Sequence, residues 1–142
     1  MEISDAVPFL AERSKAVIVT LSEGSAGDVP HATNVVYGFD GRVARVSLTD
    51  DRVKTDNLRR RPLAVLHVVS DDFWSYVAAE CDVELSAVST EPGDAPGREL
   101  LELYESVQGP HPDPEEFFQA MVDDRRLVAR LTPTRVYGQL PR

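Results

Sequence analysis

Six short runs of strand-forming residues constrain the fold of this chain more than any other feature of its sequence. Each run is apolar, β-branched or alternating, and turn-forming or polar segments separate most of them. The runs are residues 15–22, 31–39, 42–48, 63–69, 73–88 (one long or bent strand) and 127–140, which Pro133 interrupts. Asp40-Gly41 is a hairpin signal between two of them. Because exposed sheet edges must be paired or covered, we predict a small, mostly antiparallel barrel of six or more strands.

Four other segments have the residue pattern of short helices. They are residues 4–14, a stretch that follows residue 49 and ends before Pro62, residues 98–107 and residues 114–123. Residues 23–30 and 89–97 contain glycine and proline and are predicted as a turn and a loop. The fold class is therefore α+β, and the length of 142 residues predicts one domain over residues 1–142.

Composition excludes several classes of function. The formal net charge of −9 argues against nucleic-acid binding, which depends on a basic face. No apolar run approaches the roughly 20 residues of a membrane helix, and the first residues do not resemble a signal peptide. We therefore expect a cytoplasmic protein that binds neither membrane nor nucleic acid.

Familiar catalytic motifs are absent from the sequence. There is no Gly-x-Ser-x-Gly, no glycine-rich nucleotide loop, and no metal-ligand spacing among His31, His67 and His111. His67 is predicted to be a hydrogen-bonded core histidine, and Cys81, the only cysteine, a small buried hydrophobe. No metal site and no catalytic side chain is assigned, so a bound cofactor would have to supply any difficult chemistry.

The segment from Ser47 to Pro62 is the best candidate for a binding site. Five of the 15 Lys and Arg residues lie between Arg52 and Arg61. Asp50 or Asp51 is predicted to cap a helix there. Arg52 and Lys54 would then lie beside the free amides of its first turn, a favourable arrangement only with an anion present. The three arginines at positions 59–61 have a simpler interpretation, as solvated charges that complement the helix dipole.

Four segments, taken together, resemble the pyridoxamine 5′-phosphate oxidase-like split β-barrel proteins, and within them the deazaflavin (coenzyme F420)-dependent oxidoreductases of the B class. The resemblance covers nearly the whole chain. The matching patterns are Arg52-x-Lys54-x-x-Asn57-Leu58-Arg59-Arg60-x-Pro62, Pro30-His31-x-x-Asn34-Val35-x-Tyr37-x-Phe39-Asp40, Asp72-x-Trp74-Ser75-Tyr76-x-x-x-Glu80, and a closing segment from Met121 to Gly138 that contains Asp124-Arg125-Arg126.

This resemblance implies a split β-barrel that forms a homodimer with cofactor at the interface. It implies that the cofactor phosphate lies near Arg52, Val53, Lys54 and Asn57, and that Ser47 reaches the ribityl or phosphate region. His31 and Asn34 would line the ring and its chain, Trp74 would flank the cofactor, and Arg126 would come from the partner subunit. Trp74 could equally be ordinary barrel packing, and Asn34 could satisfy a strand bulge.

The function implied is coenzyme F420-dependent hydride transfer between reduced deazaflavin and a small conjugated organic acceptor. Two alternatives stay open: an FMN-dependent flavoprotein of the same superfamily, and a cofactor-binding protein without turnover. The polyglutamate tail of coenzyme F420 would need a basic track, which Arg59, Arg60 and Arg61 could supply with Arg125 or Arg126 of the partner. Affinity would then rise with tail length and fall with added salt.

Overall fold

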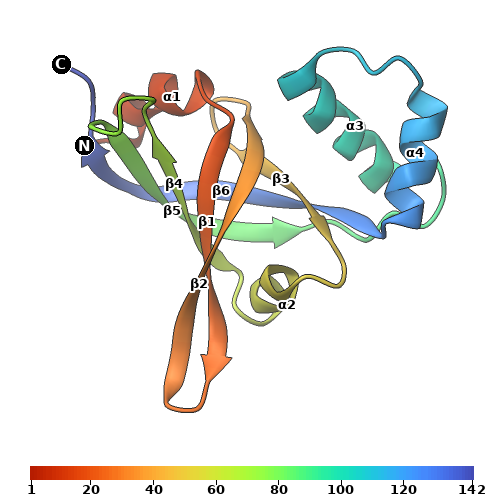
Figure 1. The fold of residues 1–142 in the computed structure, drawn as a ribbon, viewed down its shortest axis with the longest axis horizontal. Coiled ribbons are helices and arrows are strands. Elements are labelled where there is room, and N and C mark those ends of the chain that lie inside the picture. The colour runs from red at the N-terminus through yellow and green to blue at the C-terminus, as the bar shows by residue number, and fades with distance from the viewer.

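The predicted barrel is present in the computed structural model, which describes residues 1–142 (Figure 1). Six antiparallel strands close in the order β1-β2-β3-β6-β5-β4, and four helices flank them. The strands are β1 (Lys15–Gly24), β2 (Gly27–Phe39), β3 (Ala44–Thr49), β4 (Leu63–Val69), β5 (Tyr76–Leu85) and β6 (Arg126–Gln139). The helices are α1 (Ile3–Ala11), α2 (Val53–Arg60), α3 (Ala95–Gln108) and α4 (Pro114–Asp123). This confirms the α+β class and the number of strands.

Alternating side chains of the strands fill the barrel. Ile18, Leu66, Val77 and Leu131 are among the residues that are at most 1% exposed in the main core. Cys81 lies in the same core, where burial raises the pKa of its thiol to about 12. The prediction that it is a buried hydrophobe is therefore confirmed.

The last strand runs through Pro133 without interruption. Cys81 pairs with Pro133 and Glu80 with Arg135, which leaves Thr134 as an extra residue in β6. Proline has no amide hydrogen to donate to a sheet ladder, and a bulge is one of the places where a strand tolerates it. The predicted interruption is thus wrong, because a bulge accommodates the proline.

The β1–β2 hairpin extends well beyond the barrel (Figure 1). Its strands pair from Lys15 with Val36 to Gly24 with Gly27, so the turn predicted over residues 23–30 is wrong in its extent. On its other side β2 pairs with β3 only over Tyr37–Phe39. The rest of β2 is therefore a free edge, which tolerates Pro30 because no neighbouring strand needs its missing amide there.

Helix α1 packs against one end of the barrel, where Phe9 and Leu10 enter the core. The buried Tyr37 hydroxyl donates a hydrogen bond to the Leu10 carbonyl oxygen over 2.6 Å. The barrel wall and its helical cover are thus joined by one buried hydrogen bond as well as by apolar contacts.

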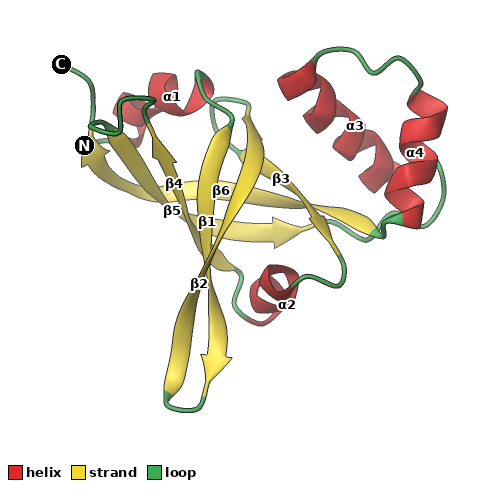
Figure 2. Cartoon of the chain, viewed as in Figure 1, coloured by secondary structure: helices red, strands yellow, loops and turns green.

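Helices α3 and α4 form a pair beside the barrel (Figure 2). Each begins with an aspartate cap followed by proline: Asp94 accepts from the Gly97 amide and Asp113 from the Glu116 amide. Glu99 of α3 accepts from Arg45 and Arg130 on the barrel at 3.0 and 2.8 Å. Hydrogen bonding to Arg130, and secondarily to Arg45, lowers the pKa of Glu99, so this anchor is charged at neutral pH.

Two further sequence predictions need correction. His67 lies half-buried on the outer face of β4 and stacks on Tyr76 with 5.3 Å between ring centroids, so it is not a core residue. Strand β5 begins only at Tyr76, because Phe73, with a φ of 75°, and Trp74 belong to the preceding turn. None of the helices has both the length and the apolar character that crossing a membrane requires.

We expect Tyr37→Phe to lower the free energy of unfolding by about 1 kcal/mol, because it removes the shorter of the hydrogen bonds to the Leu10 carbonyl and leaves the Arg13 amide as a donor at 3.4 Å. Urea-induced unfolding measures the change. Tyr137→Phe is the matched control: this side chain is exposed and has no hydrogen bond within the chain, so its effect stays below about 0.5 kcal/mol. Equal effects of the two substitutions would contradict the role of the Tyr37 hydroxyl.

Candidate cofactor site

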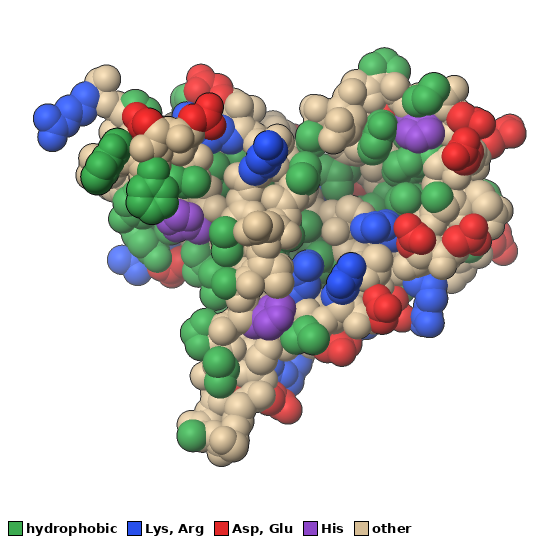
Figure 3. Space-filling model, viewed as in Figure 1, with side chains coloured by type: hydrophobic (Ala, Val, Ile, Leu, Met, Phe, Trp, Pro, Cys, Tyr) green, Lys and Arg blue, Asp and Glu red, His purple; other side chains and the backbone are tan.

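A hollow of about 290 Å³ opens where β2 separates from β3 and α2 begins. We call it the cationic hollow. It is lined by Asn34, Val35, Val36, Ser47, Leu48, Thr49, Arg52, Lys54 and Arg126. Five of the nine predicted site residues, Asn34, Ser47, Arg52, Lys54 and Arg126, therefore meet in one place. A group of Lys and Arg side chains is visible between the hairpin and the α3–α4 pair (Figure 3).

Arg52 and Lys54 have no carboxylate partner within 4.0 Å, although the chain carries 24 acidic residues. Partial burial, followed by the charge of Arg52, lowers the pKa of Lys54. Both effects make the charged ammonium less favourable than in water. An anion between Arg52 and Lys54 would relieve this repulsion.

The first amides of α2 are also without partners. Arg52 occupies the N-cap position, and no side chain caps the helix. The backbone N–H groups of Val53 and Lys54 donate to no acceptor in the chain. The predicted cap by Asp50 or Asp51 is therefore wrong: Asp51 accepts from the Thr49 hydroxyl, and Asp50 pairs with Arg59 and Arg125. Free amides and free cations in one hollow are the elements of a phosphate site.

Arg126 reaches this hollow from its own chain. Its Nη1 donates to Ser47 Oγ over 3.2 Å, across the β3–β6 ladder, and its Nε donates to Asp124 over 3.4 Å. The resemblance instead implied that Arg126 acts from a partner subunit. The difference arises because Ser47 pairs with Val128 and Thr49 with Arg126 in adjacent strands, which brings the guanidinium next to Ser47.

Asn57 does not line the hollow, and its predicted place at the phosphate needs correction. It is 5% exposed, and its Nδ2 donates to the hydroxyls of Thr20 and Ser22 over 3.0 and 2.8 Å. The side chain therefore points from α2 into β1. It holds the helix in position rather than contacting a ligand.

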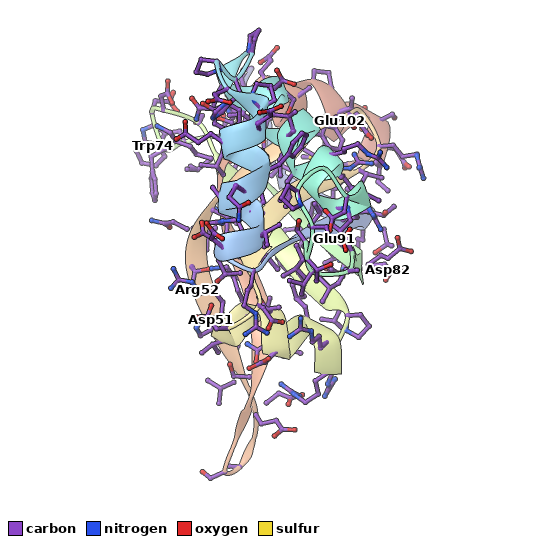
Figure 4. The ribbon with its side chains drawn as sticks, turned by 90° about the vertical axis from the view of Figure 1, so that its right-hand side faces the viewer. Asp51, Arg52, Trp74, Asp82, Glu91 and Glu102 are labelled. Carbon is purple, nitrogen blue, oxygen red and sulfur yellow. The ribbon has the colours of Figure 1, made fainter.

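Trp74 also lies away from the hollow. It is 74% exposed in the turn before β5, and Figure 4 shows it well above Arg52, which lies near the middle of the molecule. It lines none of the larger cavities of a single chain. Its predicted place beside the cofactor is therefore not present within one chain.

The other two predicted residues, His31 and Val53, do not line the hollow: Val53 directly precedes Lys54, and His31 lies three residues before Asn34 in β2. Val53 is exposed at the first position of α2. His31 Nδ1 is buried without a hydrogen-bond partner, as is Thr33 Oγ1 two residues further along β2. Buried polar atoms are rarely unpaired, so these two mark the strand beside the hollow as a place where an additional group would be favourable.

Each arginine of the predicted basic track is paired with a carboxylate of the chain. Arg59 pairs with Asp50 at 2.5 Å, Arg60 with Glu23 and Asp28, and Arg61 with Asp28. Arg125 pairs with Asp50. These arginines therefore do not form a track of unpaired cations, and they are not only solvated. Their ion pairs join α2 to the β1–β2 hairpin and to the start of β6.

A side groove of about 580 Å³ continues from the hollow along the outside of the barrel. It shares Asn34, Val35 and Val36 with the hollow and reaches His67 and Asp71 near the turn that carries Trp74. The hollow and the groove together form one elongated surface, with Arg52 and Lys54 at one end and His67 toward the other. Its cationic end and its mixed apolar and polar groove suit a ligand with a phosphate and a flat ring system.

Known proteins share this architecture, although no protein-family model matches the sequence. The conserved hypothetical protein Rv2991 of Mycobacterium tuberculosis has a TM-score of 0.74 at 23% identity, over 100% of this chain and 90% of its own. An F420 reductase has a TM-score of 0.67 at 23% identity, over 91% and 94% of the two chains. A protein of the pyridoxinephosphate oxidase family from Clostridium acetobutylicum has a TM-score of 0.64 at 13% identity, over 96% and 86%. At these identities the likeness establishes the fold alone: this chain has the split β-barrel fold that these proteins share.

Proposed function

We propose that this protein is a coenzyme F420-dependent oxidoreductase, which transfers a hydride between the deazaflavin and a small conjugated organic molecule. The observation that carries the proposal is the cationic hollow, where Arg52, Lys54 and two helix amides have no partner in the chain. The split β-barrel fold, which an F420 reductase shares, supports the same assignment.

Each residue of the hollow has a binding role in this proposal. Arg52, Lys54 and the amides of Val53 and Lys54 would hold the cofactor phosphate by charge-assisted hydrogen bonds. Ser47 would hydrogen-bond the adjacent polar chain, and Asn34 would direct the ring into the side groove. Burial of Lys54 keeps water from one side of the phosphate and strengthens these interactions.

The deazaflavin, when bound, supplies two-electron hydride chemistry. The chain then needs to hold donor and acceptor in contact, and proximity alone contributes roughly 7–11 kcal/mol in the best intramolecular cases. No side chain of the site has the oriented partner of a general base, which agrees with a reaction that depends on positioning.

A second candidate, an FMN-dependent flavoprotein, is favoured by one specific observation. Arg59, Arg60, Arg61 and Arg125 are already paired with carboxylates, so no free basic track is left for the acidic tail of coenzyme F420. FMN has the same ribityl phosphate and no tail, and the cationic hollow would accept it equally.

A second copy of the chain would complete the site in either case. The side groove is open along the free edge of β2, where Val29 and Val36 are 53% and 49% exposed. Phe73 and Trp74 are exposed at its far end. Burying these side chains against a partner would shield the ring of the cofactor from water and place Trp74 of one chain beside another copy's groove.

Substitution of Lys54 tests the phosphate site. We expect Lys54→Ala to weaken cofactor binding at least about tenfold in calorimetric titrations, since a charge-assisted hydrogen bond contributes roughly 1.5–3 kcal/mol. Arg98→Ala is the matched control, because Arg98 is also a cation without a carboxylate partner but lies on α3 away from the hollow. If a folded Lys54→Ala variant binds the cofactor with unchanged affinity, the phosphate is not bound at the start of α2.

The choice of cofactor is tested by titration with FMN and with coenzyme F420 of long and short tails, at low and high salt. Because the hollow would hold either phosphate equally, the comparison reports on the ring system, and the proposed function predicts that the deazaflavin binds more tightly than FMN. Because the arginines near the hollow are paired, shortening the tail should change affinity by less than about fivefold, as for exposed ion pairs. Tighter binding of FMN would support the second candidate instead.

Assembly is tested by light scattering at micromolar concentration. We expect a stable dimer, because the groove is incomplete along the β2 edge of one chain. A mass near the 15.7 kDa of a single chain would contradict a cofactor site at a subunit interface.

A further inference from the structure

We propose that the apolar cavity between the barrel and the α3–α4 pair is the pocket for the hydride acceptor, and that it takes a small, flat, conjugated carboxylate whose charged end meets Arg126. This inference rests on the proposed function for the identity of the hydride donor. The pocket and its ligand class follow from the cavity itself, which has a volume of about 390 Å³.

The walls of this apolar cavity are largely hydrophobic and come from both helices. They include Leu100, Leu103, Tyr104 and Val107 of α3, and Phe117 and Met121 of α4. Cavities of this size with apolar walls and few polar groups are typical of small-molecule sites. A flat apolar molecule would gain burial there without leaving polar atoms unpaired.

The barrel holds α3 rigidly over this cavity. At Gly38 the helix approaches so closely that a Cβ atom would lie 2.7 Å from Ser106 Oγ and 3.0 Å from Leu103 Cδ1. Glu99 fixes the same helix to Arg45 and Arg130. The cavity is therefore framed by a helix anchored along its length, and its shape does not depend on a mobile loop.

Three residues line both the apolar cavity and the cationic hollow: Val36, Ser47 and Arg126. A ligand in one space is thus adjacent to a ligand in the other, and because Val36 also lines the side groove proposed for the ring, the three spaces meet at this residue. Two other surface hollows lie near Arg52 or α3, but neither has both apolar walls and a boundary with the cationic hollow. One, around Asp123 and Arg125, has no apolar lining, and the other, around Gly38 and Glu102, does not touch the hollow.

Arg126 lies at the boundary with a donor to spare. Its Nη1 bonds Ser47 and its Nε bonds Asp124, whereas Nη2 donates to no group of the chain. A carboxylate at the cavity entrance would accept from this nitrogen. Asp124, which also lines the cavity, is the one acid paired with Arg126, at 3.4 Å, so a carboxylate ligand would share the guanidinium with it through the free Nη2.

The charge of Arg126 also suits the reaction. The carbon–carbon double bond of the acceptor takes up a hydride at the carbon remote from the carboxylate and a proton from water at the nearer carbon. The acceptor is thereby reduced by two electrons, which oxidation of the reduced deazaflavin supplies. Negative charge develops toward the carboxylate during hydride addition, and a preorganised cation there stabilises it.

The pocket is tested on the cofactor-free protein with 2-naphthoate as the probe. The chain has two methionines, Met1 and Met121, so protein labelled with ¹³C at the methionine methyls gives two NMR signals. Only Met121 lines the cavity. We expect 2-naphthoate to shift the Met121 signal in a saturable way and to leave the Met1 signal unchanged.

Matched variants locate the ligand. Val107→Trp fills the cavity and should abolish the shift that the ligand causes at Met121, whereas Glu102→Trp, on an exposed face of the same helix, should retain it. Gln108→Trp, from an exposed position that still lines the cavity, serves if Val107→Trp does not fold. Arg126→Gln should weaken 2-naphthoate about tenfold, as for loss of a charged hydrogen bond, and should leave the affinity for neutral 2-naphthol within about twofold, since that probe carries no charge.

If the Met121 signal does not shift, or if the shift persists when the cavity is filled, the cavity is not the binding site for the ligand and the proposal is contradicted. Equal losses of naphthoate and naphthol affinity in Arg126→Gln would overturn the role of Arg126. Because no cofactor is present, either result leaves the proposed cofactor site standing. Conversely, failure of both cofactors to bind, with a normal Met121 response, would refute the proposed function and not the pocket.

Discussion

The short pairing of β2 with β3 is the constraint on which the candidate site depends. Only Tyr37–Phe39 of the thirteen residues in β2 pair with β3, so the barrel wall opens just where α2 begins. A longer ladder would cover Asn34 and Val36 and leave no room for the cationic hollow. Instead, the start of a helix, two strands and Arg126 meet around a space that the core does not fill.

The charges in this opening are arranged against the usual preferences of a helix. Cations at a helix N-terminus are unfavourable, because the helix dipole is positive there. The chain nevertheless places Arg52 and Lys54 at that end without acidic partners, while Arg59, Arg60 and Arg61 are paired with Asp50, Glu23 and Asp28. Asn57 and these ion pairs hold α2 against β1 and the hairpin. The helix is thus fixed in place with its positive end uncompensated, which is the condition for preorganised binding of an anion.

The fold could be predicted well from the sequence because strand patterns, turn residues and helix starts are local features of the chain. Strand β4 and helix α4 have their predicted limits, since turn residues and an aspartate–proline start bound them directly. The predictions that failed depend on distant partners. Pro133 remains within β6 because this strand bulges at Thr134, opposite β5. Strand β2 continues through Pro30 because its outer edge is free.

The candidate site was predicted in part for the same reason. Arg52 and Lys54 follow from the helix start, which local sequence defines. The direction of Asn57 depends on the hydroxyls of Thr20 and Ser22, about 35 residues away in the chain, and the position of Arg126 depends on strand pairing with β3. The apolar cavity was not foreseen at all. Leu100, Leu103 and Phe117 have ordinary amphipathic spacing, and only the packing of α3 against Gly38 leaves a space beneath them.

The central claim is that the start of α2 binds the phosphate of a cofactor, and amide NMR of the uniformly ¹⁵N-labelled protein tests it most directly. The account predicts that the amide signals of Val53 and Lys54, which have no acceptor in the free chain, move strongly downfield as FMN or coenzyme F420 is added. Both signals should saturate at the same ligand concentration as the residues of the side groove. If the cofactor binds and the two amides keep their positions, the phosphate lies elsewhere and the account is contradicted.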